Sequence, residues 1–442
     1  MKIVRFFEIT IKLSLCLSFK KFPIVRLIFL PLHILTFPHL LFKGYDARLA
    51  LILESLGGVF IKIGQSLSLK SFLFEKSTIK TLAYLQDQLP PVKLDIIMYL
   101  RKTNPKLLEN SNFKVEKEPI ASASIAQVYK AKLNGDDIVL KIIKPKIKKR
   151  IEKDFAIILF LGRIVNIFCS PALQLMEVIE NIHEGILLEL NLTQELNNIQ
   201  EMRRSLILES QIHLPFVYNE FSNKHCLVIS FCEGVSLKNL IHSDSYGKHC
   251  NGVNIINKNV VAKNILECYL KQVYQNGIFH ADMHAGNILV KNDGSISLID
   301  FGLISKISEK DRIAVATLMF ALLKNDANLA IKTQFEAGYI PENVFYNYQY
   351  RLEMKKIAEG FSSNFNMSSF TGDLFKVMHK FNVFVPKHLL LLNKTILYVE
   401  DIIQQLSPSF KAFDIIEPWI KKWYYKEKIK IVFSQFMTHC GL

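Results

Sequence analysis

The sequence predicts an α+β protein with two lobes, a small mixed lobe and then a larger helical lobe, preceded by a helical extension. Residues 46–108 repeat apolar side chains three and four positions apart, as the buried face of a helix does. Residues 113–144 have a pattern typical of two strands around a turn, and the sequence after residue 234 has a mainly helical pattern. We therefore expect a basic apolar segment at 1–45, the helical extension at 46–112, the mixed lobe at 113–232, the helical lobe at 233–423 and a basic tail at 424–442.

The composition is that of a globular protein with an excess of positive charge. Apolar residues make up 50% of the 442 residues and charged residues 21%, which excludes intrinsic disorder. The net charge of +15 implies an anionic partner: nucleotide phosphates, nucleic acid or a membrane surface. No zinc-finger spacing or other nucleic-acid signature accompanies the charge, so we expect no nucleic acid partner. The seven scattered cysteines disfavour a disulfide framework and a cysteine zinc site.

The N-terminal segment combines basic and bulky apolar residues. Its first 48 residues contain eight Lys or Arg and two acidic residues. The apolar stretch at 22–42 contains three prolines, an arginine and two histidines, which disfavours a spanning helix. Either the segment is an interfacial anchor with a basic rim, or it is an arm packed on the protein; we favour contact with anionic membrane lipids. Residues 419–430 have a similar interfacial composition.

The predicted elements follow one another in a simple order. Leu49, Ile52, Leu53, Leu56 and Phe60 form the apolar face of the extension. Strands are expected at 127–133 and 137–143 around a hairpin turn that begins with Asn134-Gly135. Helical text follows at 148–208, interrupted near 170. Further strands are expected at 213–218, at 225–231 and as a pair within 287–302.

One constellation has the spacing of a phosphoryl-transfer site. Asp282 is followed five residues later by Asn287, and eighteen residues later by Asp300-Phe301-Gly302. In kinases the first Asp orients or deprotonates the attacking hydroxyl, while the Asn and the second Asp hold the metal ions. His280 and His284 flank Asp282, and we expect a structural role for His280 and a place near the phosphates for His284.

A lysine on a predicted strand completes the nucleotide signature. Lys141 lies in Val139-Leu140-Lys141-Ile142, a near match to the strand motif whose Lys binds the α- and β-phosphates. A partly buried ammonium needs a carboxylate partner. Glu189 and Glu195 in the following helical text are the two candidates.

A run of small residues stands where a glycine-rich nucleotide loop is expected. It precedes Lys141 by one hairpin, so we interpret it as the phosphate cover. Alanine and serine allow close approach but lack the backbone freedom of glycine, so the loop should be stiff. The run consists of Ile120, Ala121, Ser122, Ala123, Ser124, Ile125, Ala126, Gln127 and Val128.

The sequence after Gly302 leaves no room for a long activation segment. Helical text begins near residue 308, and no Ala-Pro-Glu follows. Ordinary protein kinases bind their peptide substrate on that segment. A small or lipid-like hydroxyl acceptor, or hydrolysis of ATP, therefore fits better than phosphorylation of a peptide.

Taken together, these motifs resemble the UbiB family of atypical protein-kinase-like proteins, which is linked to ubiquinone biosynthesis. The resemblance runs from about residue 46 to residue 423. It rests on the segment with the K-x-G-Q motif at 56–68 and on the segments at 85–91, 119–133, 187–198, 280–287, 298–302 and 389–400.

The resemblance implies a two-lobed protein-kinase-like fold that binds ATP and Mg²⁺ between its lobes. It implies that Asp282 is catalytic and that Asn287 and Asp300 bind metal. It also implies that Lys62 and Gln65 lie on a helix that folds across the nucleotide site. In this arrangement Lys62 pairs with Glu189, and Lys141 with Glu195.

The implied role is an ATP-dependent kinase or ATPase that supports ubiquinone biosynthesis and regulates ring-modifying enzymes. The implied partners are ubiquinone-pathway enzymes or quinone precursors, at the cytoplasmic face of the bacterial inner membrane. Two other functions compete: a small-molecule kinase of the aminoglycoside or choline type, which lacks the K-x-G-Q extension, and a non-catalytic scaffold that binds nucleotide or lipid.

Three features depart from the family pattern. Asn191 stands where the family's E-x-D motif has its Asp, and Ala285 replaces a usual Pro. The paired C-terminal membrane helices of many bacterial members have no counterpart in the text. We therefore expect membrane attachment to depend on the N-terminal segment and on surface patches.

Overall fold

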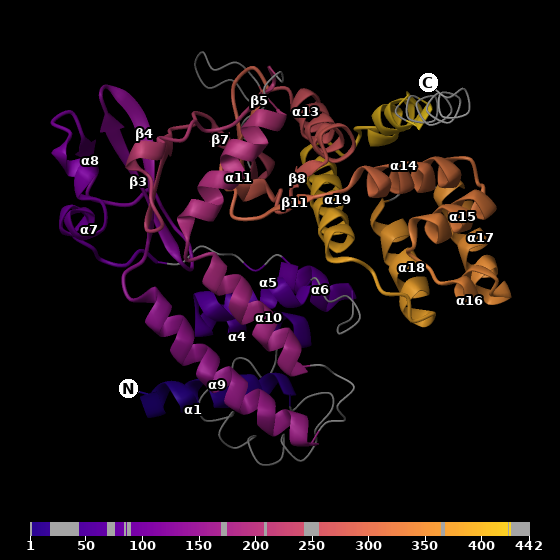
Figure 1. Ribbon diagram of the computed structural model, residues 1–442, viewed down its shortest axis with the longest axis horizontal. Helices are drawn as coiled ribbons and strands as arrows, with labels where there is room; N and C mark the ends of the chain where they lie inside the picture. The colour runs from indigo at the N-terminus through magenta and orange to yellow at the C-terminus, as the bar shows by residue number, and fades with distance from the viewer. Residues whose placement is uncertain are drawn as a thin grey trace, which may run out of the picture. The chain divides into compact units, whose positions relative to one another are not determined.

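The computed structural model describes most of the chain and divides it into two compact units. The described residues are 2–17, 44–68, 76–83, 85, 90–168, 175–206, 210–242, 256–363, 367–422 and 424–425. The first unit comprises 1–196 and 216–231, and the second comprises 197–215 and 232–442. The predicted extension and most of the predicted mixed lobe belong to the first unit, whereas residues 197–215 and 232 of that lobe belong to the second. Figure 1 shows the helices and strands along the chain. The predicted α+β fold class is confirmed.

The first unit contains an antiparallel sheet in the order β1-β3-β4-β6, with β2 paired to β3. Its strands are β1 (Lys114–Val115), β2 (Ala121–Ser122), β3 (Ala126–Leu133), β4 (Asp136–Ile143) and β6 (Cys226–Ser230). Leu133 pairs with Asp136, so β3 and β4 are joined by a two-residue turn. Both turn residues, Asn134 (φ 54°) and Gly135 (φ 97°), have the positive φ that such a hairpin requires. The predicted hairpin is therefore confirmed.

Alternation along β4 separates the core from the site. Ile138, Leu140 and Ile142 are buried on one face. Helices α7 (Ile96–Thr103) and α8 (Pro105–Glu109) belong to the same apolar cluster through Ile96, Leu100 and Leu107. Because successive strand residues point to opposite faces, Lys141 projects from the other side of the sheet.

Besides α7 and α8, helices α1, α4, α5, α6, α9 and α10 belong to this unit. Their bounds are α1 (Lys2–Leu17), α4 (Tyr45–Leu56), α5 (Gly58–Ser68), α6 (Lys76–Ala83), α9 (Ile147–Phe168) and α10 (Leu175–Leu188). The apolar residues that predicted the extension, Leu49, Ile52, Leu53, Leu56 and Phe60, are all buried. Gly57 separates α4 from α5 with φ +98°, a conformation that glycine adopts readily.

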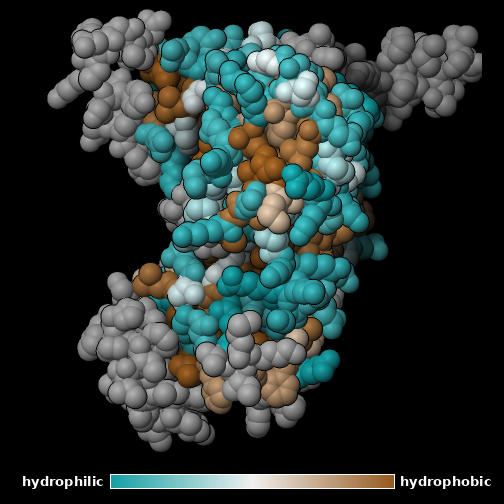
Figure 2. Space-filling view, turned by 90° about the vertical axis from the view of Figure 1, so that its left-hand side faces the viewer, coloured by the Kyte–Doolittle hydropathy of each residue, from teal (hydrophilic) through white to brown (hydrophobic). Residues whose placement is uncertain are grey.

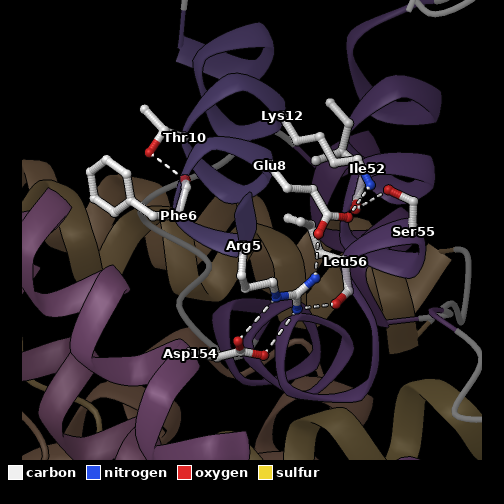
Figure 3. A network of polar contacts seen from close by, with 9 residues as sticks. All are labelled: Arg5, Phe6, Glu8, Thr10, Lys12, Ile52, Ser55, Leu56 and Asp154. Atoms are coloured by element: carbon white, nitrogen blue, oxygen red, sulfur yellow. Dashed lines mark hydrogen bonds and ion pairs between the residues drawn. The ribbon is translucent and has the colours of Figure 1, made fainter. Parts of the chain in front are cut away.

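Helix α1 is tied to the rest of the unit through Arg5 (Figure 3). The guanidinium donates to both carboxylate oxygens of Asp154 at 3.1 and 3.0 Å, and to the Leu56 carbonyl at 2.6 Å. Glu8 accepts from Arg5 at 2.9 Å and from Lys12 at 2.8 Å. Two of the eight basic residues counted for membrane contact are therefore held in ion pairs within the protein.

The contacts of α1 bear on both interpretations of the N-terminal segment. Ile9 and Lys12 are buried and Phe6 contacts Phe160 of α9 with ring centroids 5.9 Å apart, whereas Phe7 is 57% exposed. The apolar stretch at 22–42 and the tail beyond residue 425 lie outside the described residues, and membrane contact there stays a prediction. Trp419, from the other interfacial segment, packs against Tyr274.

The second unit contains a four-stranded sheet in the order β5-β10-β9-β7 and a two-stranded sheet of β8 and β11. Their bounds are β5 (Ile212–His213), β7 (Val235–Ser236), β8 (Ile278–His280), β9 (Ile288–Val290), β10 (Ile296–Leu298) and β11 (Ile304–Lys306). The predicted strand pair within 287–302 is confirmed as β9 and β10. The predicted strand at 213–218 is wrong in extent, because only Ile212–His213 forms a strand, parallel to β10, and Val217 makes an isolated bridge to Ile229.

The rest of the second unit is mainly helical, as predicted. Its helices include α12 (Leu237–His242), α13 (Lys258–Leu270), α14 (Glu309–Leu323), α15 (Ala327–Ala337), α16 (Glu342–Phe345), α17 (Tyr348–Ser363), α18 (Met367–Lys380) and α19 (Lys387–Leu406). Helix α11 (Leu192–Ser205) contains the boundary between the units. None of the described helices is both long and apolar enough to cross a bilayer.

The surface is predominantly hydrophilic on the face drawn in Figure 2, with separate apolar groups among the polar residues. Exposed apolar side chains in the first unit include Ile97, Met98 and Phe216. Scattered apolar residues of this kind are ordinary on soluble domains.

Removing Arg5 should destabilise the first unit. Arg5→Met leaves the Asp154 carboxylate, whose side chain is 3% exposed, without its cation, so we expect the free energy of unfolding to fall by about 2–4 kcal/mol. Lys148→Met on α9 is the control, because its exposed pair with Glu152 at 4.0 Å should contribute less than about 0.5 kcal/mol. Urea unfolding measures both; equal losses would contradict the role of Arg5.

Candidate nucleotide and phosphoryl-transfer site

Lys141 forms the ion pair that the nucleotide signature requires. Its Nζ lies 2.8 Å from Oε1 of Glu195, and the two side chains are 16% and 6% exposed. Of the two carboxylate candidates, the structure therefore pairs Glu195 with Lys141, and the expectation from the family resemblance is confirmed. The pair holds the Lys141 ammonium on the face of β4 opposite the apolar core, where an ammonium can bind phosphates.

Asn191, the residue that departs from the family's E-x-D motif, stabilises the helix that carries Glu195. Its Oδ1 accepts a hydrogen bond from the backbone N–H of Thr193 at 3.1 Å. Asn191 directly precedes α11, so this is an N-cap contact, which satisfies a backbone donor in the first turn. The substitution removes a carboxylate but retains a good helix-capping side chain.

The K-x-G-Q helix α5 contributes a second ion pair. Lys62 Nζ lies 3.0 Å from Glu189 Oε2, so this predicted pair is also confirmed. Gln65, one turn later, donates from Nε2 to the Leu85 carbonyl at 3.0 Å. That bond commits part of the Gln65 amide to the extension itself, and its contact with a nucleotide stays a prediction.

The alanine-rich loop is a small hairpin. Ala121 pairs with Val128 and Ser122 with Gln127, and the Ala123 N–H donates to the Ala126 carbonyl at 2.9 Å. These bonds fix the backbone of the turn, which agrees with the expected stiffness. Lys144 donates to the Ala123 carbonyl from the far end of β4.

Only part of this loop can cover a nucleotide with its side chains. Gln127 is 1% exposed, accepts from the Val92 N–H at 2.6 Å and donates to the Tyr129 hydroxyl at 2.9 Å. Its assignment to nucleotide binding is therefore wrong, because its amide serves the protein core. Ser124, Ile125 and Ala126 are also buried, whereas Ile120 is half exposed. The accessible part of the loop is 120–123, together with the half-buried Val128 at its end.

Gly58 is a residue that sequence reasoning missed. A Cβ atom at this position would lie 2.4 Å from Ser124 Cβ and 2.8 Å from Ser124 Cα. The first residue of α5 thus packs directly on the alanine-rich loop, and only glycine fits. The Gly57-Gly58 pair at the start of the K-x-G-Q text was the available signal.

His280 organises the catalytic loop in the second unit. Its Nδ1 accepts from the Asp282 N–H at 3.1 Å, and its Nε2 is bonded to the Asp300 carbonyl. Since Nδ1 accepts, the ring proton lies on Nε2. Burial lowers the pKa of His280 and favours this neutral form. The expected structural role is confirmed, and the bonding of both ring nitrogens excludes the zinc-pair interpretation of His280.

Asn287 and Asp300 are held where side-chain oxygens can meet a cation. Asn287 donates from Nδ2 to the Asp282 carbonyl at 3.1 Å, which orients its Oδ1 as the ligand atom. Asp300 Oδ1 accepts from the Gly302 N–H at 2.9 Å. Phe301 is buried, and its carbonyl accepts from Asn198 at 2.8 Å. Two oxygen ligands from the protein, completed by phosphates and water, fit the preference of Mg²⁺.

Asp282 has a partner that the sequence did not indicate. Lys394 Nζ on α19 lies 2.8 Å from Asp282 Oδ1, and the lysine side chain is 15% exposed. His284 Nε2 is 3.9 Å from Asp282 Oδ2. The available signal was a single lysine within the apolar text Leu389-Leu390-Leu391-Leu392-Asn393-Lys394-Thr395-Ile396.

The segment after Gly302 is as short as expected. Strand β11 is followed by Ser308, whose hydroxyl accepts from the Asp311 N–H at 3.1 Å and caps α14. Helix α14 begins at Glu309, so no extended activation segment intervenes.

The comparisons with known proteins agree with this geometry. The family model described as "ABC1 atypical kinase-like domain" matches residues 84–334, and that described as "UbiB helical domain" matches 354–411. The chain belongs to the UbiB family. A relative from Aeromonas hydrophila named "Probable protein kinase UbiB" is 32% identical, over 86% of this chain and 70% of the relative. A UbiB relative from Vibrio cholerae is 31% identical, over 86% of this chain and 71% of the relative.

A solved structure has a fold similar to that of this UbiB-family protein. The complex of Rv3197 with erythromycin from Mycobacterium tuberculosis matches with a TM-score of 0.55 and 20% identity. The match covers 80% of this chain and 90% of that chain. At this identity the likeness concerns the fold alone.

Gly58→Ala should disturb the alanine-rich loop. The new methyl group overlaps Ser124, so we expect a loss of about 1–3 kcal/mol in the free energy of unfolding. Gly185→Ala is the control: it lies within α10 with nothing near its added Cβ, and should gain up to about 1 kcal/mol. Urea unfolding measures both variants. Similar behaviour of the two would show that the contact of Gly58 with the loop is not tight.

Proposed function

We propose that this UbiB-family protein is an ATP-dependent atypical kinase or ATPase that supports ubiquinone biosynthesis. The observation that carries the proposal is the bonding of the catalytic loop. Through His280 and Asn287, the backbone holds Asp282, Asn287 and Asp300 in one network. These are the three side-chain types, at the correct sequence spacing, that phosphoryl transfer from ATP requires.

Each residue has a defined role in this proposal. Lys141, held by its pair with Glu195, would bind the α- and β-phosphates of ATP. Asn287 and Asp300 would hold Mg²⁺, which neutralises charge on the phosphate oxygens when it is bound. Asp282 would orient an acceptor hydroxyl or a water molecule. The acceptor oxygen forms a bond to the γ-phosphorus, the bond to ADP breaks, and the acceptor proton is released.

The architecture of the second unit favours a small or lipid-like acceptor, or water, over a peptide. Helix α14 begins soon after β11 and leaves no platform of the kind on which protein kinases bind peptides. In the first unit, the ion pair of Lys62 with Glu189 ties α5 to the residues preceding α11. A gating role for Lys62 and Gln65 agrees with this contact.

The biological part of the proposal follows the names of the relatives. Proteins named UbiB match most of this chain, and the proposed partners are ubiquinone-pathway enzymes or quinone precursors. The proposed location is the cytoplasmic face of the bacterial inner membrane, with peripheral attachment to anionic lipids. The net charge of +15 supports such attachment.

Nucleotide binding is testable by thermal stabilisation. Lys141→Met and Asp300→Asn should each abolish the shift in unfolding temperature produced by Mg²⁺–ATP, because they remove a phosphate contact and a metal ligand. Lys130→Met on β3, whose contact with Asp137 at 3.8 Å is partly exposed, is the control and should keep the shift. A full shift in both site variants would refute the assigned site.

The cellular role is testable in a deletion strain. Loss of the gene should lower ubiquinone and cause a ring-modified precursor to accumulate, measured by mass spectrometry of lipid extracts. A wild-type copy should restore ubiquinone, and an Asp282→Asn copy should not. Full restoration by the Asp282→Asn copy would favour a non-catalytic scaffold instead.

A further inference from the structure

The catalytic loop receives a cation from outside the region that matches the kinase-like domain. That match ends at residue 334, whereas Lys394 lies on α19, within the match to the UbiB helical domain. We propose that Lys394 is a positioning residue for Asp282, so that the helical domain completes the catalytic centre. This inference rests on the proposed phosphoryl-transfer function.

The burial of Lys394 is the first argument. It lies in the middle of α19, next to the fully buried Thr395 and between Leu391 and Tyr398, which are both buried. A lysine whose side chain is only 15% exposed needs a carboxylate or several acceptors for its ammonium group. The Asp282 carboxylate, at 2.8 Å, meets that need. The pair therefore fixes the lysine and the carboxylate together.

The second argument is that α19 contacts the catalytic loop at two points one helical turn apart. Lys394 reaches Asp282, and the Tyr398 ring lies 6.3 Å from the His284 ring in an edge-on arrangement. Lys394 Nζ also lies 5.3 Å from the centre of the Tyr398 ring, a favourable position for a cation. Burial raises the pKa of Tyr398 and keeps its hydroxyl neutral. The helix thus holds both sides of the Asp282–His284 segment.

The ion pair with Lys394 fixes the orientation of the Asp282 carboxylate. Oδ1 of Asp282 is bound to Lys394, and His284 Nε2 lies 3.9 Å from Oδ2. A carboxylate anchored through one oxygen presents the other in a fixed direction. Orientation of the reacting groups strongly affects the rate of the chemical step. Lys394 would therefore act on turnover rather than on nucleotide binding.

The test compares four proteins, assayed with Mg²⁺–ATP by release of ADP. Lys394→Met should lower kcat at least tenfold and change the KM for ATP less than threefold, because it loosens Asp282 but removes no phosphate contact. Lys394→Arg, which keeps the charge, should recover a substantial part of the lost kcat. Lys387→Met, an exposed lysine on the same helix, should match the wild type.

A double variant separates positioning from general stability. Asp282→Asn/Lys394→Met should be no slower than Asp282→Asn alone, because Lys394 acts through Asp282. It also removes both partners of the pair, so it should fold even if Lys394→Met does not. Additive losses in the double variant, or a normal kcat with a raised KM in Lys394→Met, would overturn the proposal.

The same assay distinguishes failure of the proposed phosphoryl-transfer function from failure of the proposed role of Lys394. If the wild-type protein binds Mg²⁺–ATP but releases no ADP, the phosphoryl-transfer function itself fails, and the positioning role falls with it. If the wild type turns over ATP and Lys394→Met does so equally well, the proposed function stands and the role of Lys394 is wrong.

Discussion

The ion pair of Lys141 with Glu195 is the constraint on which the first unit is built. Strand alternation commits Ile138, Leu140 and Ile142 of β4 to the apolar core, so Lys141 must face the opposite side. A poorly solvated ammonium there requires a carboxylate, and that carboxylate must come from a helix beside the sheet. The start of α11 is fixed accordingly: Asn191 caps it, and the Leu192 N–H donates to the Lys224 carbonyl at 3.1 Å. A core strand thereby holds in place the lysine that we propose binds phosphates.

The second unit uses backbone contacts for the same purpose. The neutral His280 ring joins the Asp282 N–H to the Asp300 carbonyl, and Asn287 returns a bond to the Asp282 carbonyl. The backbone of the two acidic residues is thereby held by groups that carry no net charge. A buried cationic His280 would need a carboxylate of its own and would compete with Mg²⁺ for Asp300. The charged contacts are those of Lys394 and of the groups that we propose contact ATP.

The N-terminal charges show that the net charge of a segment does not reveal which groups its basic residues contact. Arg5 and Lys12 contribute to the basic excess of the first 48 residues, yet both are paired within the first unit. Arg5 also binds the carbonyl of Leu56, the last residue of α4, immediately before the Gly57-Gly58 pair and the K-x-G-Q helix (Figure 3). A segment whose composition suggests a membrane surface thus includes a helix that supports the extension.

The sequence by itself determined the elements whose signals are local. The Asn134-Gly135 hairpin, the apolar face of α4 and α5, and the spacing of Asp282, Asn287 and Asp300 depend on residues close together in the chain. The family resemblance added the pairs of Lys62 with Glu189 and Lys141 with Glu195. Only the tertiary structure decided that Gln127 serves the core, that Gly58 packs on Ser124, that β5 pairs with β10, and that Lys394 binds Asp282. These contacts join residues 35 to 112 positions apart or depend on close packing. Local propensity and periodicity do not predict contacts between residues so far apart in the sequence, because these contacts depend on how distant segments pack.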